Sequence, residues 1–241
     1  MLDYVIQLIA SFFAVVIVLT LHEFSHAFVA YKCGDPTPKF SRRLTLNPLR
    51  HFDIVGLLCF TFVGFGWAKP VPINPNNFKK YRSGLALTSS AGVIMNYITA
   101  FVFFPLFMVV LNFGGGMPDV LGGFFYYFTL DLFSYSLSFC VFNLLPFHPL
   151  DGFNLIDALS RRRRRVLEFL RKYGYYILLT LVVESFVCRR MVDGGIAMAT
   201  YFDVLGWIMK FATNIFGYPI VALWNLLPWN IKIDWRIIPW L

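Results

Sequence analysis

Long apolar runs separated by short polar stretches dominate the pattern of this chain. Four runs approach or exceed the roughly 20 helical residues that cross a bilayer core. They cover residues 4–31, 85–113, 121–145 and 204–227. A fifth run, residues 173–188, spans only about 24 Å as a helix and needs extra turns or a locally thinner membrane. The pattern therefore predicts an all-α polytopic membrane protein with about five to six transmembrane helices.

Residues 54–67 (IVGLLCFTFVGFGW) form an apolar stretch that is too short to cross a membrane comfortably as a helix. The stretch is rich in β-branched and aromatic residues and contains three glycines. We expect a short re-entrant or β-hairpin element near these residues. Because irregular backbone at membrane depth needs protein or a wet cavity to satisfy its polar groups, this element is expected to line a site.

The composition agrees with a membrane protein. Charged residues make up 14% of the 241 residues and apolar residues 58%, which excludes soluble, disordered and coiled-coil classes. The net charge of +8 lies in the gaps between apolar runs instead of along one basic face, so no nucleic-acid partner is expected. The first residues lack the basic region of a cleavable signal peptide, and we expect the first run to stay as an anchor in the lipid bilayer.

The first apolar run carries three costly side chains within the sequence HEFSH, residues 22–26. On a helix, His22 and His26 share one face, so both imidazoles can bind one Zn²⁺ ion. Glu23 follows directly and can reach a water at the metal. The alternative is a chance match in which the histidines are buried and bonded to backbone. Inside a membrane span the metal site is the better interpretation, because burying ionisable His and Glu side chains in the bilayer costs free energy unless they have a function.

A catalytic zinc site needs a third protein ligand. Asp151 stands out because Pro146 and Pro149 interrupt the helix before it and Gly152 relieves crowding after it. The alternative role for Asp151 is a helix N-cap. The other candidates for the third ligand are His51, Asp53, Asp131, His148 and Glu184. Asp131 and Glu184 are expected to sit near a span end or to pair locally, and His51 and Asp53 to brace the site.

These blocks together resemble the site-2 protease family of intramembrane zinc metalloproteases. The order and spacing of the blocks are much more specific than HExxH alone, and they resemble the compact prokaryotic subgroup without a PDZ domain. The matching blocks are HEFSH at 22–26, Asn47-Pro48 with His51, Asp53 and Gly56, FGWAKPVP at 65–72, and Asn143-Leu144-Leu145-Pro146 leading to Asp151-Gly152.

The resemblance implies that His22, His26 and Asp151 bind zinc and that Glu23 is the catalytic base. It also implies that Asn143 holds substrate or the oxyanion. The family usually reads Ala-Gly-Pro and then Asn where this chain has Ala91-Gly92-Val93 and Asn96, so a role for Asn96 does not follow from it. We expect one domain, with a catalytic membrane core in residues 1–160. Residues 161–241 would supply a basic loop, over 160–172, and C-terminal transmembrane helices.

The predicted function is hydrolysis of peptide bonds in or near the transmembrane helices of membrane-spanning protein substrates. A membrane zinc transporter or metal-sensing protein could use the same ligands, but it would predict polar residues along several spans or inverted repeats. A di-iron enzyme is short of ligands, because the chain has four histidines. A prenyl-protein endopeptidase would leave the block at Asp151 unexplained. The sequence names no regulatory partner.

The distribution of Lys and Arg predicts the orientation in the cell membrane. Nine of these residues lie in the region 32–82 and seven in 161–172, whereas the loop 114–122 has none. Both basic regions, and with them the active site, are therefore expected on the cytoplasmic side. The Arg run 161–165 could instead bind anionic lipid or a regulatory partner.

Overall fold

Helices carry most of the described chain in this computed structural model, which describes residues 2–63, 66, 68–160 and 165–233. The described residues contain no β-strand, only a single isolated β-bridge. The α-helices are α1 (Leu2–Cys33), α2 (Thr37–Phe40), α3 (Ile54–Val63), α4 (Tyr81–Phe113), α5 (Asp119–Leu144), α6 (Asp151–Leu159), α7 (Arg165–Asp193) and α8 (Val204–Trp224). Short 3-10 turns, η1 to η4, occupy Pro48–Arg50, Pro75–Asn77, Gly114–Gly116 and Ala197–Phe202.

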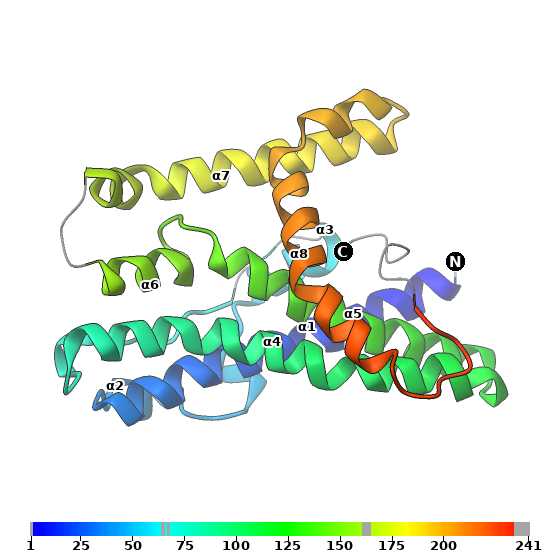
Figure 1. The fold of residues 1–241 in the computed structure, drawn as a ribbon, viewed down its shortest axis with the longest axis horizontal. Helices are drawn as coiled ribbons and strands as arrows, with labels where there is room; N and C mark the ends of the chain where they lie inside the picture. The colour runs from blue at the N-terminus through cyan, green and yellow to red at the C-terminus, as the bar shows by residue number, and fades with distance from the viewer. Residues whose placement is uncertain (1, 64–65, 67, 161–164, 234–241) are drawn as a thin grey trace.

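The helices α1, α4 and α5 pack side by side as the central bundle (Figure 1). Fully buried alanines on α1, including Ala10, Ala14 and Ala27, let its backbone approach its neighbours closely, as in other membrane bundles. Large side chains such as Phe104 and Phe133 fill the core between α4 and α5. This bundle positions the ends of α1 and α5, where the candidate residues lie.

Four helices of the described chain are long and apolar enough to cross a membrane, and they are α1, α4, α5 and α8. These are the four long runs of the sequence, so the prediction of an all-α polytopic membrane protein is confirmed. The fifth run lies inside α7, which is not one of the four. A total of five or six spans stays a prediction.

Helix α7 begins at Arg165, so the expectation of a loop over 160–172 is wrong for residues 165–172. Helix α7 contacts α6 and the turn that precedes α6. Arg171 donates to Asp157 at 2.8 Å, and its guanidinium lies 5.9 Å from the centre of the Phe153 ring. Gly174 lies directly against the backbone of His148, because a Cβ atom there would come within 2.8 Å of the His148 nitrogen.

The short apolar element after residue 53 begins as the helix α3 and not as a β-hairpin. The carboxylate of Asp53 accepts a hydrogen bond from the Gly56 amide at 2.9 Å, which satisfies a free amide of the first helical turn. Phe52 and Ala68 form the β-bridge, and the Lys69 amide donates to the His51 carbonyl at 2.9 Å. The element therefore enters and leaves at one place, as a re-entrant segment requires. Residues 64, 65 and 67 lie outside the described chain.

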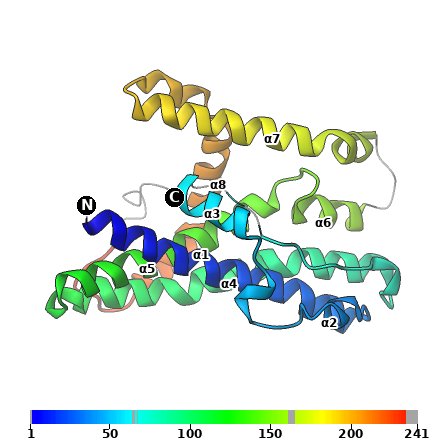
Figure 2. The same cartoon turned by 180° about the vertical axis from the view of Figure 1, so that it is seen from behind.

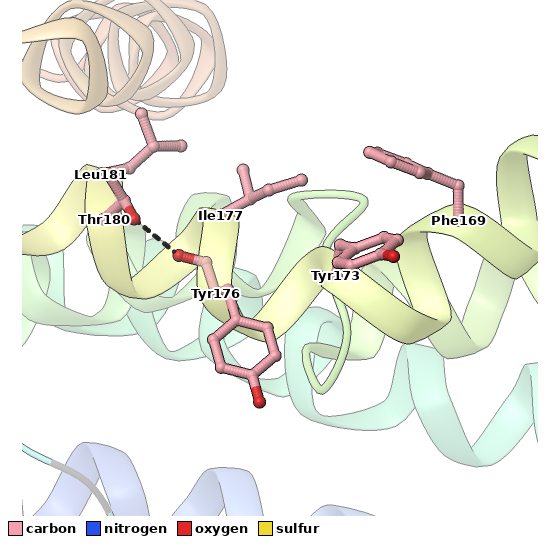
Figure 3. Close-up of a pocket in the computed structure, with 6 residues that line it drawn as sticks. All are labelled: Phe169, Tyr173, Tyr176, Ile177, Thr180 and Leu181. Atoms are coloured by element: carbon pink, nitrogen blue, oxygen red, sulfur yellow. Dashed lines mark hydrogen bonds between the residues drawn. The ribbon is translucent and has the colours of Figure 1, made fainter.

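The helix α7 lies on the far side of α6 from the central bundle, as both ribbon views show (Figure 1, Figure 2). Helix α8 runs across the bundle and connects the two layers. An apolar hollow of about 420 Å³ lies on α7, lined by Phe169, Tyr173, Tyr176, Ile177, Thr180 and Leu181 (Figure 3). None of the candidate zinc ligands lines this hollow.

Candidate active site

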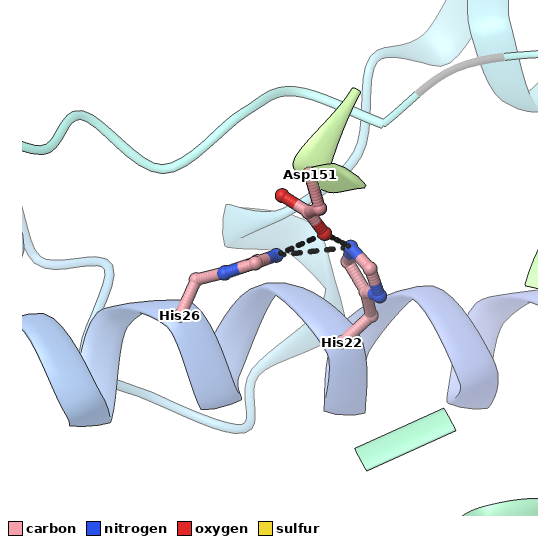
Figure 4. A group of neighbouring side chains, drawn as sticks. All are labelled: His22, His26 and Asp151. Carbon is pink, nitrogen blue, oxygen red and sulfur yellow. Dashed lines mark hydrogen bonds and ion pairs between the residues drawn. The ribbon is translucent and has the colours of Figure 1, made fainter. Parts of the chain in front are cut away.

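Three potential metal ligands meet where α1 faces the start of α6 (Figure 4). His22 and His26 stand one turn apart on α1, and their Nε2 atoms are 3.1 Å from each other. Asp151 Oδ2 lies 3.4 Å from His22 Nε2 and 3.1 Å from His26 Nε2. Both imidazoles are buried, and the Asp151 side chain is 15% exposed. The structure thus brings together the three residues that the sequence predicts as zinc ligands.

A tight return of the chain after α5 brings Asp151 to the histidines. Helix α5 ends at Leu144, and the Leu150 amide donates to the Phe147 carbonyl at 2.8 Å within the proline-containing turn. Gly152 then packs directly on the end of α5, since a Cβ atom there would overlap the Leu144 carbonyl. Leu150 is the N-cap of α6, and Asp151 is its first residue. The carboxylate therefore faces the histidines, and the alternative in which Asp151 is the N-cap is not observed.

The hydrogen bond behind the His26 ring leaves the lone pair of its other nitrogen directed at the meeting point. His26 Nδ1 lies 2.8 Å from the Thr88 carbonyl, which can only accept, so Nδ1 carries the proton. In the neutral ring the Nε2 lone pair then faces Asp151 Oδ2, a buried oxygen that receives no hydrogen bond. This nitrogen lone pair and this carboxylate oxygen, two acceptors facing each other, fit a cation bound between them.

The spacing of the three atoms and the gap beside them also fit a metal ion. Two donors bound to one tetrahedral zinc at about 2.0–2.1 Å lie about 3.4 Å apart, close to the separations found here. Gly92 of α4 borders the same point, because a Cβ atom there would overlap His26 Nε2 and come within 2.7 Å of His22 Nε2. A side chain at residue 92 would fill the space that a cation needs.

Glu23 is held beside this group by an extended segment. Its Oε2 atom accepts a hydrogen bond from the Val71 amide at 3.0 Å. Val71 is itself buried and belongs to the extended stretch that follows Ala68. Electrostatic interactions also couple Glu23 to His26 and Asp151. One oxygen of Glu23 is thus fixed, and Oε1 remains for chemistry.

The segment that holds Glu23 is in turn tied to the end of α1 by Asp35. Its carboxylate accepts bonds from the Asn74 amide at 2.7 Å and the Asn77 side-chain amide at 2.8 Å, besides two from Thr37. Burial opposes the charged form of Asp35, but these hydrogen bonds outweigh burial and hold the pKa of the carboxyl below its ordinary value. Asp35 therefore stays ionised and acts as a brace.

Comparison with known proteins identifies the family. The chain is 40% identical over 201 residues, 79% of its own length and 86% of the relative's, to the Bacillus subtilis (strain 168) protein named "Putative zinc metalloprotease YwhC". The chain belongs to the site-2 protease family. A second relative, "Putative zinc metalloprotease Rip2" of Mycolicibacterium smegmatis, is 25% identical over 80% of this chain and 70% of that protein. No family profile matches the chain, and no solved structure matches it either. Both relatives are named zinc metalloproteases, and zinc is the metal that the sequence predicts.

The other candidate residues of this site-2 protease family member lie outside the three-ligand group. Asn143 is on the last turn of α5 and donates through Nδ2 to the Phe139 carbonyl at 3.0 Å. Asp131 accepts a 2.5 Å bond from Ser11, between α5 and α1. Glu184 accepts a bond from the Val204 amide at 3.3 Å. The Asp131 carboxylate therefore joins α5 to α1, and the Glu184 carboxylate joins α7 to the start of α8.

The candidate residues His51 and His148 make local contacts, and the expectation that His51 and Asp53 brace the site stays a prediction. His51 is fully buried and its Nε2 lies 2.8 Å from the Thr45 carbonyl, and burial lowers the pKa of this imidazole. The His148 ring packs edge-on against Phe153. The buried guanidinium of Arg43 donates to the Arg50 and Lys69 carbonyls, which fixes the start of the extended segment. Arg43 and Asp35 belong to no motif of the sequence analysis, and the block at 65–72 that contains Val71 does not predict its bond to Glu23.

Proposed function

We propose that this protein is an intramembrane zinc metalloprotease, which cleaves peptide bonds in or near transmembrane helices of membrane protein substrates. The observation that carries the proposal is the convergence of His22, His26 and Asp151 with Glu23 beside them, at the end of a candidate membrane helix. The names of both relatives support zinc and proteolysis. In this proposal residues 1–160 are the catalytic membrane core, and residues 161–241 add a basic segment and further helices.

His22 and His26 through Nε2, and Asp151 through a carboxylate oxygen, are the proposed zinc ligands. Two imidazoles and one carboxylate are a known donor set for catalytic zinc, and they leave a position open. When bound, zinc supplies a Lewis acid that polarises a carbonyl and makes water a nucleophile near neutral pH.

Glu23 is the proposed general base. The Val71 amide occupies Oε2, so Oε1 is the atom that takes a proton from the attacking water. The same atom then returns the proton to the nitrogen of the departing amine. The bond from Val71 also keeps the carboxylate oriented in both stages, so that proton transfer needs no rearrangement of the side chain.

Asn143 and the backbone near the site are the proposed substrate contacts. The Nδ2 atom of Asn143 uses one hydrogen on the Phe139 carbonyl, which leaves a second hydrogen for a substrate carbonyl. A helical substrate keeps its amides in internal hydrogen bonds, so it must unwind locally before cleavage. Gly, Pro or Asn residues near the cut favour this unwinding.

The proposed location is the cell membrane, with the site toward the cytoplasm. In the ribbon views α2, the start of α4, α6 and the start of α7 lie at one end of the molecule (Figure 1, Figure 2). The N-terminus and the turn between α4 and α5 lie at the other end. The basic segments thus gather at one end, as expected for the cytoplasmic side of a membrane protein.

Cysteine labelling in intact cells tests this orientation. In the variants Lys80→Cys and Glu168→Cys we expect no reaction with an impermeant thiol reagent, because both positions belong to the cytoplasmic end. In Met117→Cys, within the turn between α4 and α5, we expect full labelling. The wild-type chain gives the baseline of its four native cysteines. Labelling at 80 without labelling at 168 would mean that residues 54–67 cross the membrane.

Purified protein in detergent tests the function itself. We expect one zinc ion per chain and cleavage of a model substrate that contains one transmembrane helix. Removal of the metal with a chelator should abolish cleavage, and added zinc should restore it. Zinc-loaded protein that cuts no membrane-spanning substrate but moves zinc into vesicles would favour the transporter instead. Full cleavage by metal-free protein would contradict the proposal outright.

A further inference from the structure

Asn96 lies on α4 with its amide against the imidazole of His22. Its Nδ2 atom is 3.0 Å from His22 Nδ1, and the residue is fully buried. The other amide atom, Oδ1, is buried without a hydrogen-bond partner. The amide therefore touches the back of a proposed zinc ligand, and in this orientation its oxygen remains unsatisfied.

Counting protons on His22 indicates which amide atom faces the ring when zinc is bound. His22 Nε2 is the nitrogen that points toward His26 and Asp151. A neutral imidazole carries one proton, so an Nε2 atom that binds zinc leaves the proton on Nδ1. The Nδ1–H group then needs an acceptor. The two orientations of an amide have the same shape, and rotating the Asn96 amide by a half turn brings its oxygen to Nδ1.

The neighbouring histidine already has this arrangement. The Thr88 carbonyl of α4 accepts from His26 Nδ1 at 2.8 Å. Thr88, Gly92 and Asn96 are spaced by four residues, so they lie along one face of α4. This face supplies an acceptor to each imidazole, with Gly92 giving the room between them.

We propose that Asn96 is a positioning residue of the zinc site, whose Oδ1 accepts a hydrogen bond from His22 Nδ1–H. The bond fixes the ring and the tautomer that leaves Nε2 available to the metal. The inference rests on the proposed function, because it requires His22 to bind zinc through Nε2. Partners behind ligating histidines typically change metal affinity about 10- to 100-fold.

Zinc affinity of two Asn96 variants tests the inference, measured by competition with a chelator on detergent-purified protein. Asn96→Leu removes the acceptor and is expected to weaken zinc binding by about 10- to 100-fold. Asn96→Asp keeps an acceptor and has no donor, so its affinity should equal or exceed that of wild type. Thr99→Val is the matched control, because Thr99 is buried on the same helix and its hydroxyl donates to the Met95 carbonyl of that helix.

The outcomes separate this inference from the proposed function. If Asn96→Asp binds zinc as poorly as Asn96→Leu, the amide donates to His22 and the inference is wrong. Wild-type affinity in Asn96→Leu would also overturn it. If Asn96→Leu does not fold, the comparison of Asn96→Asp with wild type still decides, because only an acceptor role predicts unweakened binding. A wild-type protein without zinc affinity would refute the proposed function first. Cobalt-loaded protein gives a second readout, since its visible absorption should change in Asn96→Leu and not in Thr99→Val.

Discussion

Replacing Glu23 by Gln should lower peptide cleavage by at least about 100-fold while zinc binding stays intact. The amide of the new side chain has nearly the shape of the carboxylate and can still accept from the Val71 amide, so the local structure persists. It cannot take a proton from water, and that loss removes general base catalysis. Cleavage of a transmembrane substrate and zinc per chain are measured on the same preparation.

The matched control for Glu23→Gln is Glu168→Gln, the same chemical change on an exposed residue of α7. This control should cleave at the wild-type rate. If Glu23→Gln also cleaves at that rate, Glu23 is not the base. If Glu23→Gln instead loses zinc, the carboxylate is a ligand, and a different residue must move the proton.

Replacing Asp151 by Asn should lower zinc affinity by at least about 100-fold and abolish cleavage with it. Loss of a residue that hydrogen-bonds to a ligand typically lowers metal affinity about 10- to 100-fold. Asp151 is proposed to bind the metal directly, so its replacement should lower zinc affinity at least as much. The neutral amide also leaves two histidines without the negative charge that lies 3.1–3.4 Å from them. Zinc content after dialysis against a graded series of chelator concentrations measures the effect.

Asp131→Asn is the control for Asp151→Asn. Asp131 is also buried, but it bonds to Ser11 away from the three-ligand group, and an Asn oxygen can accept the same bond. Its zinc affinity should match that of wild type. Retained zinc in Asp151→Asn together with loss in Asp131→Asn would transfer the third ligand to Asp131.

The sequence predicted those parts of the site that depend on local geometry. The pair of histidines follows from the four-residue spacing on a helix, and Asp151 follows from the prolines that interrupt the chain before it. Asn96 and Val71 escaped prediction because their roles depend on how α4 and the extended segment pack against α1. No spacing in the sequence encodes a contact between Asn96 and His22.

The fold was predictable to a similar extent. Apolar runs of span length located α1, α4, α5 and α8, because hydrophobic length is a strong constraint in a bilayer. The composition of residues 54–67 predicted a re-entrant or β-hairpin element, whereas residues 54–63 form a helix whose first turn Asp53 caps. Helix α7 starts earlier than its apolar run, and Arg171 of its first turns pairs with Asp157 of α6. The polar composition of these first turns gave no sign of the helix.

The arrangement of the three proposed ligands also governs when a growing chain can become active. The two histidines belong to the first helix, whereas Asp151 and the turn that directs it follow α5. Gly92 and Thr88, which complete the surroundings of the rings, arrive with α4 in between. A chain interrupted at any point before residue 151 therefore brings an incomplete set of donors to the membrane. In the proposed function, the three ligands are complete only after most of the helices have been made, so an unfinished chain would lack the metal site and its activity.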